Sequence, residues 1–266
     1  MTTQLWIGFL LAVGVAVAAR TVRSLSRSGM YAAILSGTII FGLGGWQWAI
    51  LLLTFFFSST ALTRAFKQRK REANEKYAKG GERDAGQVFG NGSVATLFAA
   101  LHCFYPQAVW PWIGFAASLA AVNADTWATE LGVLNPRPPH LITNLSKKVE
   151  KGTSGGISLV GTLAALAGSA LIALLAVLLS PSLNTDDWLL ITLSGLAGSL
   201  FDSLLGATTQ AIYYCSACQK ETERHPLHAC GTQTQHIRGW TWLDNDWVNF
   251  ACGATGAMLA LAARLF

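Results

Sequence analysis

The sequence contains very little charge. Only 12% of its 266 residues are charged, whereas 52% are hydrophobic and the mean hydropathy is +0.40. Average soluble domains carry about 25% charged residues. This scarcity excludes an ordinary soluble domain. It predicts an all-α, polytopic membrane helix bundle with about seven or eight transmembrane helices.

Positive charge is missing ahead of the first apolar run. No basic residue precedes Leu5–Ala19, whereas Arg20, Arg23 and Arg27 follow it. A secretory signal peptide has the opposite arrangement, so we expect a retained first helix. Internal repeats and low-complexity segments are also lacking, and residues 1–266 are expected to form one integral membrane domain.

Eight apolar segments are candidate spans of roughly 15–25 residues, long enough to cross a bilayer. They lie near residues 4–19, 29–44, 46–63, 88–104, 107–124, 156–180, 187–213 and 247–263. The second segment is short and rich in glycine, which is why the expected number is seven or eight.

Basic residues are missing from every second loop. The first, third, fifth and seventh loops carry 18 of the 19 basic residues. The positive-inside rule places these loops in the cytoplasm and both termini outside. The net charge of +5 therefore reflects topology and does not indicate nucleic acid binding. The expected surroundings are a lipid bilayer.

Residues 64–87 are predicted to form a basic cytoplasmic linker. The linker could simply anchor the chain at lipid phosphates. Alternatively, Arg83 and its neighbours could hold a phosphorylated substrate or a nucleotide. The small and amide residues of 87–93 fit either helix packing or the lining of such a site.

The segment 123–132 places charge inside a predicted membrane helix, where charge is costly and usually marks a substrate or ion site. Asn123, Thr126 and Glu130 share one face of an ideal helix, whereas Asp125 lies on the opposite side. Such a helix must lie inside the bundle or end here, and Gly132 supplies the end. Two carboxylates without a basic neighbour repel each other unless a divalent cation such as Mg²⁺ joins them.

The alternative for this segment is structural, with the polar groups bonding to neighbouring helices. Ideal helical spacing directs Glu130 about 140° away from Asp125, so Asp125 is the stronger candidate.

A glycine-rich turn follows in the next cytoplasmic loop, beside Lys148 and Lys151. It contains Gly152, Thr153, Ser154, Gly155 and Gly156. Free backbone N–H groups at such a turn can hold phosphate. It is not a Walker A motif, because the lysines precede the glycines. The alternative is an ordinary helix start that Thr153 or Ser154 caps.

A polar stripe marks the seventh segment. Ser199, Asp202, Ser203, Gly206 and Gln210 recur at helical spacing. Asp202 is either a structural hydrogen-bonding residue or the second acidic ligand of the Mg²⁺ expected at Asp125, with Ser203 beside it.

The loop 214–246 is predicted to be a cytoplasmic loop that holds a Cys/His cluster. Cys215, Cys218, His228 and Cys230 offer four ligands for a structural zinc ion, and His225 or His236 could replace His228. Free thiols or a redox pair are the alternatives. Cys103 and Cys252 are expected to pack in apolar spans.

Asp246, close to a cluster of Trp residues typical of the membrane interface, could reach the acidic site.

These segments together resemble one family. The motifs at 87–92, 123–132, 151–156, 198–206 and 242–246, with the Cys-x-x-Cys loop, are similar to the integral membrane family of unknown function number 92. That family includes transmembrane protein 19 and the plant phytyl-phosphate kinase of vitamin E synthesis. More distantly, the Asp-Thr-x-Ala and Lys-x-x-Glu-x-Gly-Thr motifs are similar to phytol and dolichol kinases and to phosphatidate cytidylyltransferases.

The resemblance implies phosphoryl transfer from CTP or another nucleoside triphosphate to an isoprenyl monophosphate, most simply phytyl phosphate. In this scheme Asp125 and Asp202 hold Mg²⁺, while Lys148, Lys151 and the backbone of 152–156 hold phosphates. Asn123, Thr126 and Glu130 orient the ligands. A CTP-dependent cytidylyltransferase acting on a lipid phosphate and a lipid or ion transporter are the alternatives.

Overall fold

The computed structural model describes residues 2–66, 77 and 81–265. Most of the predicted basic linker, residues 67–76 and 78–80, lies outside the described residues. The helices are α1 (Thr2–Thr21), α2 (Arg27–Ile39), the π-helical turn η1 (Ile40–Gly44), α3 (Trp46–Ala65), α5 (Ala85–His102), α6 (Trp110–Gly132), α7 (Leu159–Leu178), α8 (Thr185–Thr208) and α9 (Asn245–Ala263). The strands are β1 (His140–Leu141), β2 (Asn144–Lys148), β3 (Gly156–Ile157), β4 (Ile212–Cys215), β5 (Lys220–Thr222) and β6 (Gln235–Arg238).

The helices match the apolar segments of the sequence one for one, with α2 and η1 together forming the second. The predicted helical bundle is confirmed. The end of α6 at Gly132 agrees with the predicted end of the polar segment, whereas α8 ends at Thr208, five residues before the expected end. The strands were not predicted; they form two three-stranded sheets, ordered β2-β1-β3 and β5-β4-β6.

Polar side chains fix where several helices begin. Asp84 and Asn184 form capping boxes with Gln87 and Asp187 at the starts of α5 and α8. Ser158 accepts a hydrogen bond from the backbone of Gly161 at the start of α7. Each cap satisfies backbone N–H groups that the first helical turn leaves without a partner.

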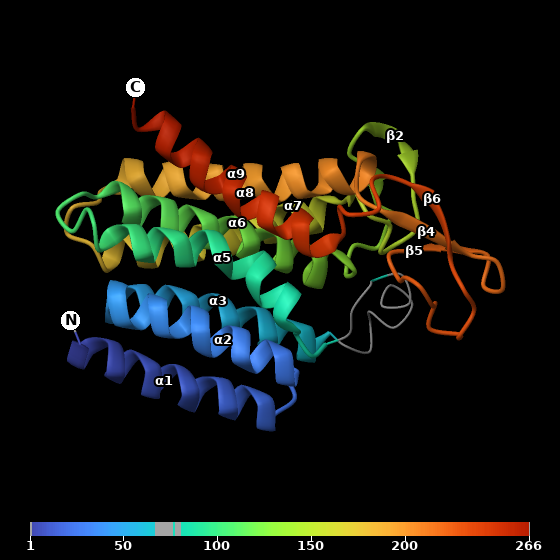
Figure 1. The fold of residues 1–266 in the computed structure, drawn as a ribbon. Helices are drawn as coiled ribbons and strands as arrows, with labels where there is room; N and C mark the ends of the chain where they lie inside the picture. Colours follow the sequence, from blue (N-terminus) through green and yellow to red (C-terminus); the bar gives the residue numbers. More distant parts are fainter. Residues whose placement is uncertain (1, 67–76, 78–80, 266) are drawn as a thin grey trace.

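Helix α6 is the centre of the bundle. It packs most extensively against α7, α8 and α9, and also against α5 and α3 (Figure 1). Every residue from Pro111 to Ala124 is buried. The small side chains of Ala116, Ala117, Ala120 and Ala121 let the neighbouring helices approach closely. The expectation that this helix lies inside the bundle is confirmed.

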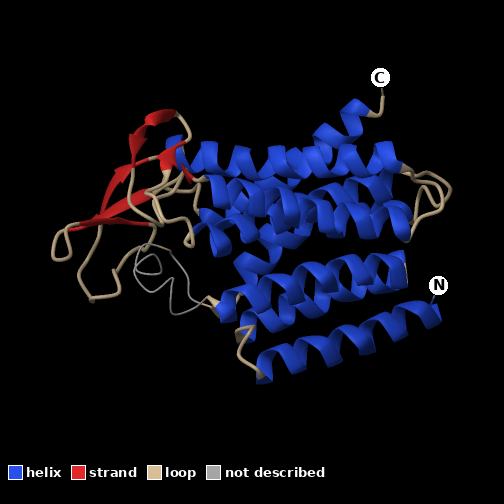
Figure 2. Cartoon of the chain, turned by 180° about the vertical axis from the view of Figure 1, so that it is seen from behind, coloured by secondary structure: helices blue, strands red, loops and turns tan. Residues whose placement is uncertain are grey.

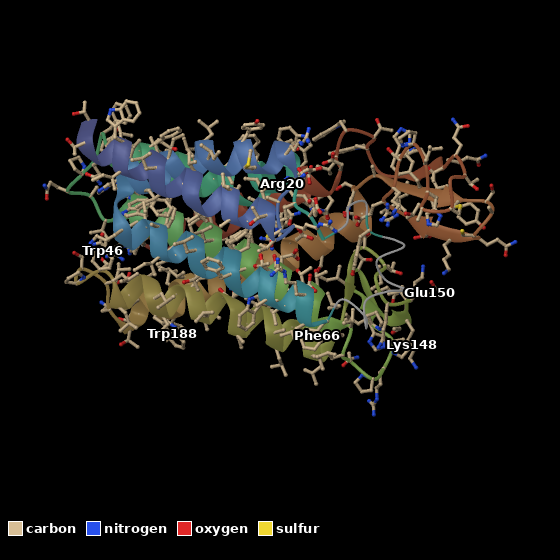
Figure 3. The ribbon with its side chains drawn as sticks, turned by 90° about the horizontal axis from the view of Figure 1, so that it is seen from below. Arg20, Trp46, Phe66, Lys148, Glu150 and Trp188 are labelled. Carbon is tan, nitrogen blue, oxygen red and sulfur yellow. The ribbon has the colours of Figure 1, made fainter. Side chains whose placement is uncertain are left out.

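Both small sheets lie at one end of the bundle (Figure 2). The described parts of the loops that carry the basic residues are at this end, and both termini are at the other (Figure 1). Figure 3 shows Trp46 and Trp188 at the terminal end, Arg20 and Phe66 at the opposite end, and Lys148 and Glu150 beyond it. The sequence predicted that loops with and without basic residues alternate. In the structure these two kinds of loop correspond to two distinct ends of the molecule.

The outer face of the bundle is apolar. Trp6, Phe57, Leu163, Leu193 and Met258 are among the large hydrophobic side chains that stay more than half exposed. Four helices of the described chain, α1, α3, α7 and α8, are long and apolar enough to cross a membrane. A surface of this kind suits lipid. The number of seven or eight spans stays a prediction.

Asn123 joins three helices in the interior. Its Nδ2 donates to the carbonyl of Gly168 in α7 at 2.7 Å, and its Oδ1 accepts from Ser58 and Ser59 of α3 at 3.2 and 3.5 Å. The residue is fully buried. Buried amide groups that lose their partners are costly, so these bonds fix how α3, α6 and α7 pack.

We expect Asn123→Ala to lower the free energy of unfolding by about 1–3 kcal/mol, because it leaves buried polar groups without a partner. Thermal unfolding in detergent measures the effect. The control is Asn135→Ala, which removes one exposed hydrogen bond to the carbonyl of Arg137. Equal melting temperatures for the two variants would contradict the role assigned to Asn123.

Candidate functional site

A cavity of about 690 Å³ opens at the end of the bundle where the sheets lie. Side chains and backbone from α3, α5, α6, α7, α8 and α9 line it, together with the loops that connect them. The C-terminal end of α6 projects into this cavity. The helix that is buried along most of its length thus ends at a polar space.

Five carboxylates line the cavity: Glu82 just before α5, Asp125 and Glu130 on α6, Asp202 on α8, and Glu223 after β5. Glu130 is buried, and its Oε1 accepts a 2.8 Å hydrogen bond from Thr63 on α3. Oδ2 of Asp202 is buried and has no hydrogen-bond partner among the residues that the structure describes. An oxygen donor in that state, close to other carboxylates, fits a site for a hard cation such as Mg²⁺.

Glu223 is a carboxylate of this cavity that the sequence analysis did not identify. Its Oε1 accepts hydrogen bonds from Ser154 at 2.7 Å and from Gln210 at 3.0 Å. Antiparallel pairing of β5 with β4 returns the chain to the end of α8 and so places Glu223 at the cavity. The sequence offers no local signal for this, because Glu223 stands in a polar loop among other charged residues.

Arg83 supplies positive charge at the edge of the cavity. Its backbone exchanges hydrogen bonds with Ser24 and Ser26, and its guanidinium lies 5.6 Å from the ring centres of Phe55 and Phe56. Burial lowers the pKa of Arg83 to about 10, while the nearby Glu130 acts in the opposite direction. The side chain therefore remains cationic at neutral pH in a partly apolar setting.

The glycine-rich turn lies against α8. Gly155 has a φ of +81°, and a Cβ at this position would be 2.5 Å from the backbone nitrogen of Ala207. Only glycine permits both the conformation and the approach. Ser158, rather than Thr153 or Ser154, caps the helix that follows, and Ser154 instead bonds to Glu223.

A second, apolar cavity of about 90 Å³ lies between α1, α2, α3 and α5. Its walls are mostly alanine, valine, leucine, isoleucine and phenylalanine. Arg83, Gln87 and Asn91 line both cavities. These three residues therefore form the boundary between a polar and an apolar compartment.

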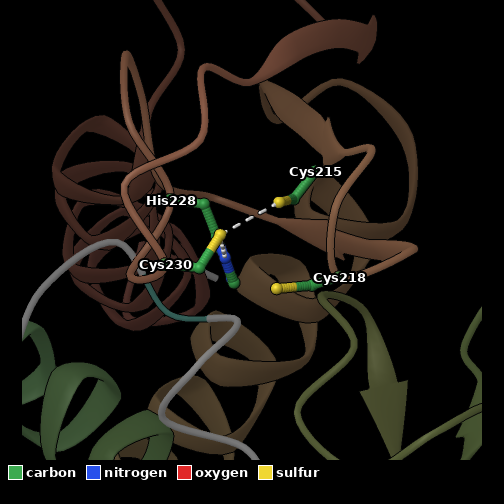
Figure 4. Close-up of side chains that lie close together, drawn as sticks. All are labelled: Cys215, Cys218, His228 and Cys230. Carbon is green, nitrogen blue, oxygen red and sulfur yellow. Dashed lines mark hydrogen bonds between the residues drawn. The ribbon is translucent and has the colours of Figure 1, made fainter.

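The cysteines of the last large loop lie together. The ligand atoms of Cys215, Cys218, His228 and Cys230 all lie within 4.8 Å of one another (Figure 4). Hydrogen bonds with Thr232 and then with His228 lower the pKa of the Cys230 thiol to about 5, because they favour the thiolate.

The two other histidines considered for this cluster pack elsewhere. His225 stacks on Tyr213 with ring centres 4.5 Å apart, and His236 meets the same ring edge-on at 5.4 Å. His228 is thus the histidine that the fold brings to the cysteines.

Residues 10–257 match the family described as integral membrane protein DUF92. The chain belongs to this family. Protein PGR of Arabidopsis thaliana is 34% identical over 92% of this chain and 90% of its own length. An uncharacterized membrane protein of Methanocaldococcus jannaschii is 35% identical over 77% of this chain and 82% of its own length.

A third relative is protein VTE6, chloroplastic, of Arabidopsis thaliana. It is 26% identical over 92% of this chain and 67% of its own length. No solved structure matches the chain significantly. The family resemblance read from the motifs is confirmed, and with it the assignment as an integral membrane protein.

Most of the residues that the DUF92 motifs singled out meet in the polar cavity. They are Asp125, Thr126, Glu130, Lys151, Gly152, Thr153, Ser154, Gly155, Gly156, Asp202 and Ser203. Glu130 lines the same cavity as Asp125 although the two point in different directions, because the cavity surrounds the end of α6. The Nζ of Lys151 donates to the carbonyl of Val133 at 2.9 Å, close to the C-terminus of that helix.

Three predicted site residues are not among those that line the cavity. Asn123 lies deeper and bonds to α3 and α7. Lys148 lies on β2, whose residues are all exposed, beyond the end of the bundle (Figure 3). Asp246 lies in the first turn of α9, where Asn245 and Asn249 line the cavity instead. Helical spacing and loop membership were too coarse to separate these residues from those that line the cavity.

We expect Gly155→Ala to destabilise the protein by about 1–3 kcal/mol, because the backbone strain adds to a collision with α8. Gly231→Ala is the matched control, since Gly231 has a φ of +83° but no atom within 4 Å of an added Cβ. The Gly231→Ala variant therefore has the backbone strain without the steric collision. Thermal unfolding in detergent compares the two, and an equal loss would show that the contact with Ala207 is unimportant.

Proposed function

We propose that this DUF92 protein transfers the terminal phosphoryl group of a nucleoside triphosphate, CTP or another, to an isoprenyl monophosphate. The product is the isoprenyl diphosphate, and phytyl phosphate is the simplest acceptor. The observation that carries the proposal is the pair of adjoining cavities, one acidic and polar and one apolar, with Arg83 on their shared boundary. Membership of DUF92, the family whose resemblance implied this reaction, supports it.

The two cavities fit the two parts of such an acceptor. The part of the hydrocarbon tail next to the phosphate would enter between α1, α2, α3 and α5, where the walls are apolar. The rest of a phytyl chain would extend into the bilayer, because a cavity of about 90 Å³ holds only a few carbon atoms. The phosphate would then reach Arg83, Gln87 and Asn91, which offer a cation and amide groups. A free sugar or nucleotide substrate would have no use for the apolar compartment.

The donor phosphates would bind at the opposite wall. Backbone N–H groups of 152–156 are available there, with Lys151 beside them. Asp125 and Asp202 would hold Mg²⁺, and Glu223 lies close enough to act on the same cation electrostatically. When bound, Mg²⁺ neutralises charge on the phosphate oxygens, which is the main requirement of phosphoryl transfer.

The transfer itself needs no strong base. An oxygen of the acceptor phosphate forms a bond to the terminal phosphorus of the donor, and the bond from that phosphorus to the bridging oxygen breaks. A nucleoside diphosphate leaves. Because the acceptor oxygen is already ionised, the protein contributes position and charge neutralisation. The basic loops around the cavity favour a cytoplasmic active site, where nucleotide is available.

We expect Asp125→Asn and Asp202→Asn each to reduce turnover on the order of 100-fold or more, since each removes charge that holds the cation. The assay offers the purified protein in detergent a panel of prenyl phosphates and nucleotides and records product masses. The control is Asp186→Asn, an exposed residue in the first turn of α8 at the far end of the bundle.

Each outcome of this assay discriminates between functions. Prenyl diphosphate with a nucleoside diphosphate supports the kinase. Pyrophosphate release identifies a cytidylyltransferase, and an absence of turnover in detergent, where no gradient exists, favours a transporter. Full activity in both aspartate variants would refute the metal assignment.

Filling the apolar cavity tests the position of the tail. Ala16 on α1 is buried and lines the cavity, whereas Ala18 on the same helix is exposed. We expect Ala16→Leu to raise the KM for the prenyl phosphate several-fold and to leave the KM for the nucleotide unchanged, because the added methyl groups occupy the tail's space. Ala18→Leu should change neither value. A rise in the KM for nucleotide alone would place the tail elsewhere.

A further inference from the structure

The Cys/His cluster has the spacing of ligands around one ion. The Sγ atoms of Cys215 and Cys230 are 3.6 Å apart, and Nδ1 of His228 is 3.3 Å from the Sγ of Cys230. A tetrahedral zinc ion with Zn–S bonds of about 2.3 Å separates its sulfur ligands by roughly 3.8 Å. A disulfide would require about 2.05 Å. The observed separations therefore match a shared ion and exclude a bond between these two sulfurs.

The donor set agrees with that geometry. Three thiol groups and one imidazole are soft to borderline ligands, which select zinc over Mg²⁺. The cluster is separate from the carboxylate cavity, because none of its four residues lines that cavity. The chain thus carries two separate groups of metal-ligating side chains, one of three thiols and an imidazole and one of carboxylates.

We propose that Cys215, Cys218, His228 and Cys230 bind one structural zinc ion that holds Glu223 in the carboxylate cavity. Four protein ligands leave no open position on the metal, so the ion organises the loop and does not act on a substrate. This inference goes beyond the proposed phosphoryl transfer and does not depend on it.

The position of Glu223 links the two sites. Cys215 and Cys218 belong to the β4–β5 hairpin, whereas His228 and Cys230 follow it. Glu223 stands midway, five residues after Cys218 and five before His228. An ion that joins both sides closes this short loop and reduces its freedom. The carboxylate is then kept against Ser154 and Gln210.

Zinc content tests the first half of the proposal. Protein purified in detergent with a reductant should contain about one zinc ion per chain by elemental analysis. Cys215→Ser and Cys218→Ser should lose it, whereas Cys103→Ser and His225→Ala, which alter residues outside the cluster, should retain it. A wild-type protein that neither contains nor takes up zinc, or whose intact mass shows a disulfide among these cysteines, would overturn the proposal.

Hydrogen–deuterium exchange tests the link to Glu223 without any assay of activity. Removing zinc from the folded wild-type protein with a chelator should increase exchange several-fold in residues 152–156. Glu223→Ala should produce the same increase there while the zinc content stays unchanged. If zinc removal leaves exchange in 152–156 as it was, the ion does not position Glu223. Because chelation starts from folded protein, this test holds even if a cysteine variant fails to fold.

Discussion

The burial of α6 from Pro111 to Ala124 is the constraint on which the rest of the structure depends. A helix enclosed by other helices cannot present charge to lipid or to water along its length. Its sequence obeys this from Pro111 to Ala124, with small and apolar side chains that let neighbours pack closely. Where Asp125 and Glu130 follow, the surrounding helices open into a polar cavity. The location of the site is thus a consequence of how the core is built.

The alternation of helix direction then determines which segments reach that cavity. Every second connection returns to the same end, so residues from α6, α8 and the loop after β5 meet although they are far apart in sequence. Short strands complete the arrangement, because they hold the connecting loops against the helix ends. Gly155, pressed against Ala207, shows how tightly one of these loops is seated.

Hydropathy, charge and motif spacing predicted much of this from sequence. The long apolar segments predicted the helices. Charge within those segments, which is costly in a membrane, identified Asp125 and Asp202, and both line the same cavity. Features that depend on pairing between segments far apart in the sequence could not be predicted. The small sheets are too short to have a local pattern, and Glu223 reaches the cavity only through one of them. Lys148 was misplaced for the same reason: its strand carries it outward.

The charges of the cavity support the proposed amphipathic phosphate over a cation or an anion alone. Carboxylates gather where α6 and α8 end, while Arg83 stands at the apolar boundary over Phe55 and Phe56. A cation alone would leave the arginine without an anionic ligand, and a phosphate alone would face the carboxylates. A metal-bound phosphate satisfies both signs at once. Since Arg83 also borders the apolar cavity, in the proposed complex it would fix the depth at which the head group ends and the hydrocarbon begins.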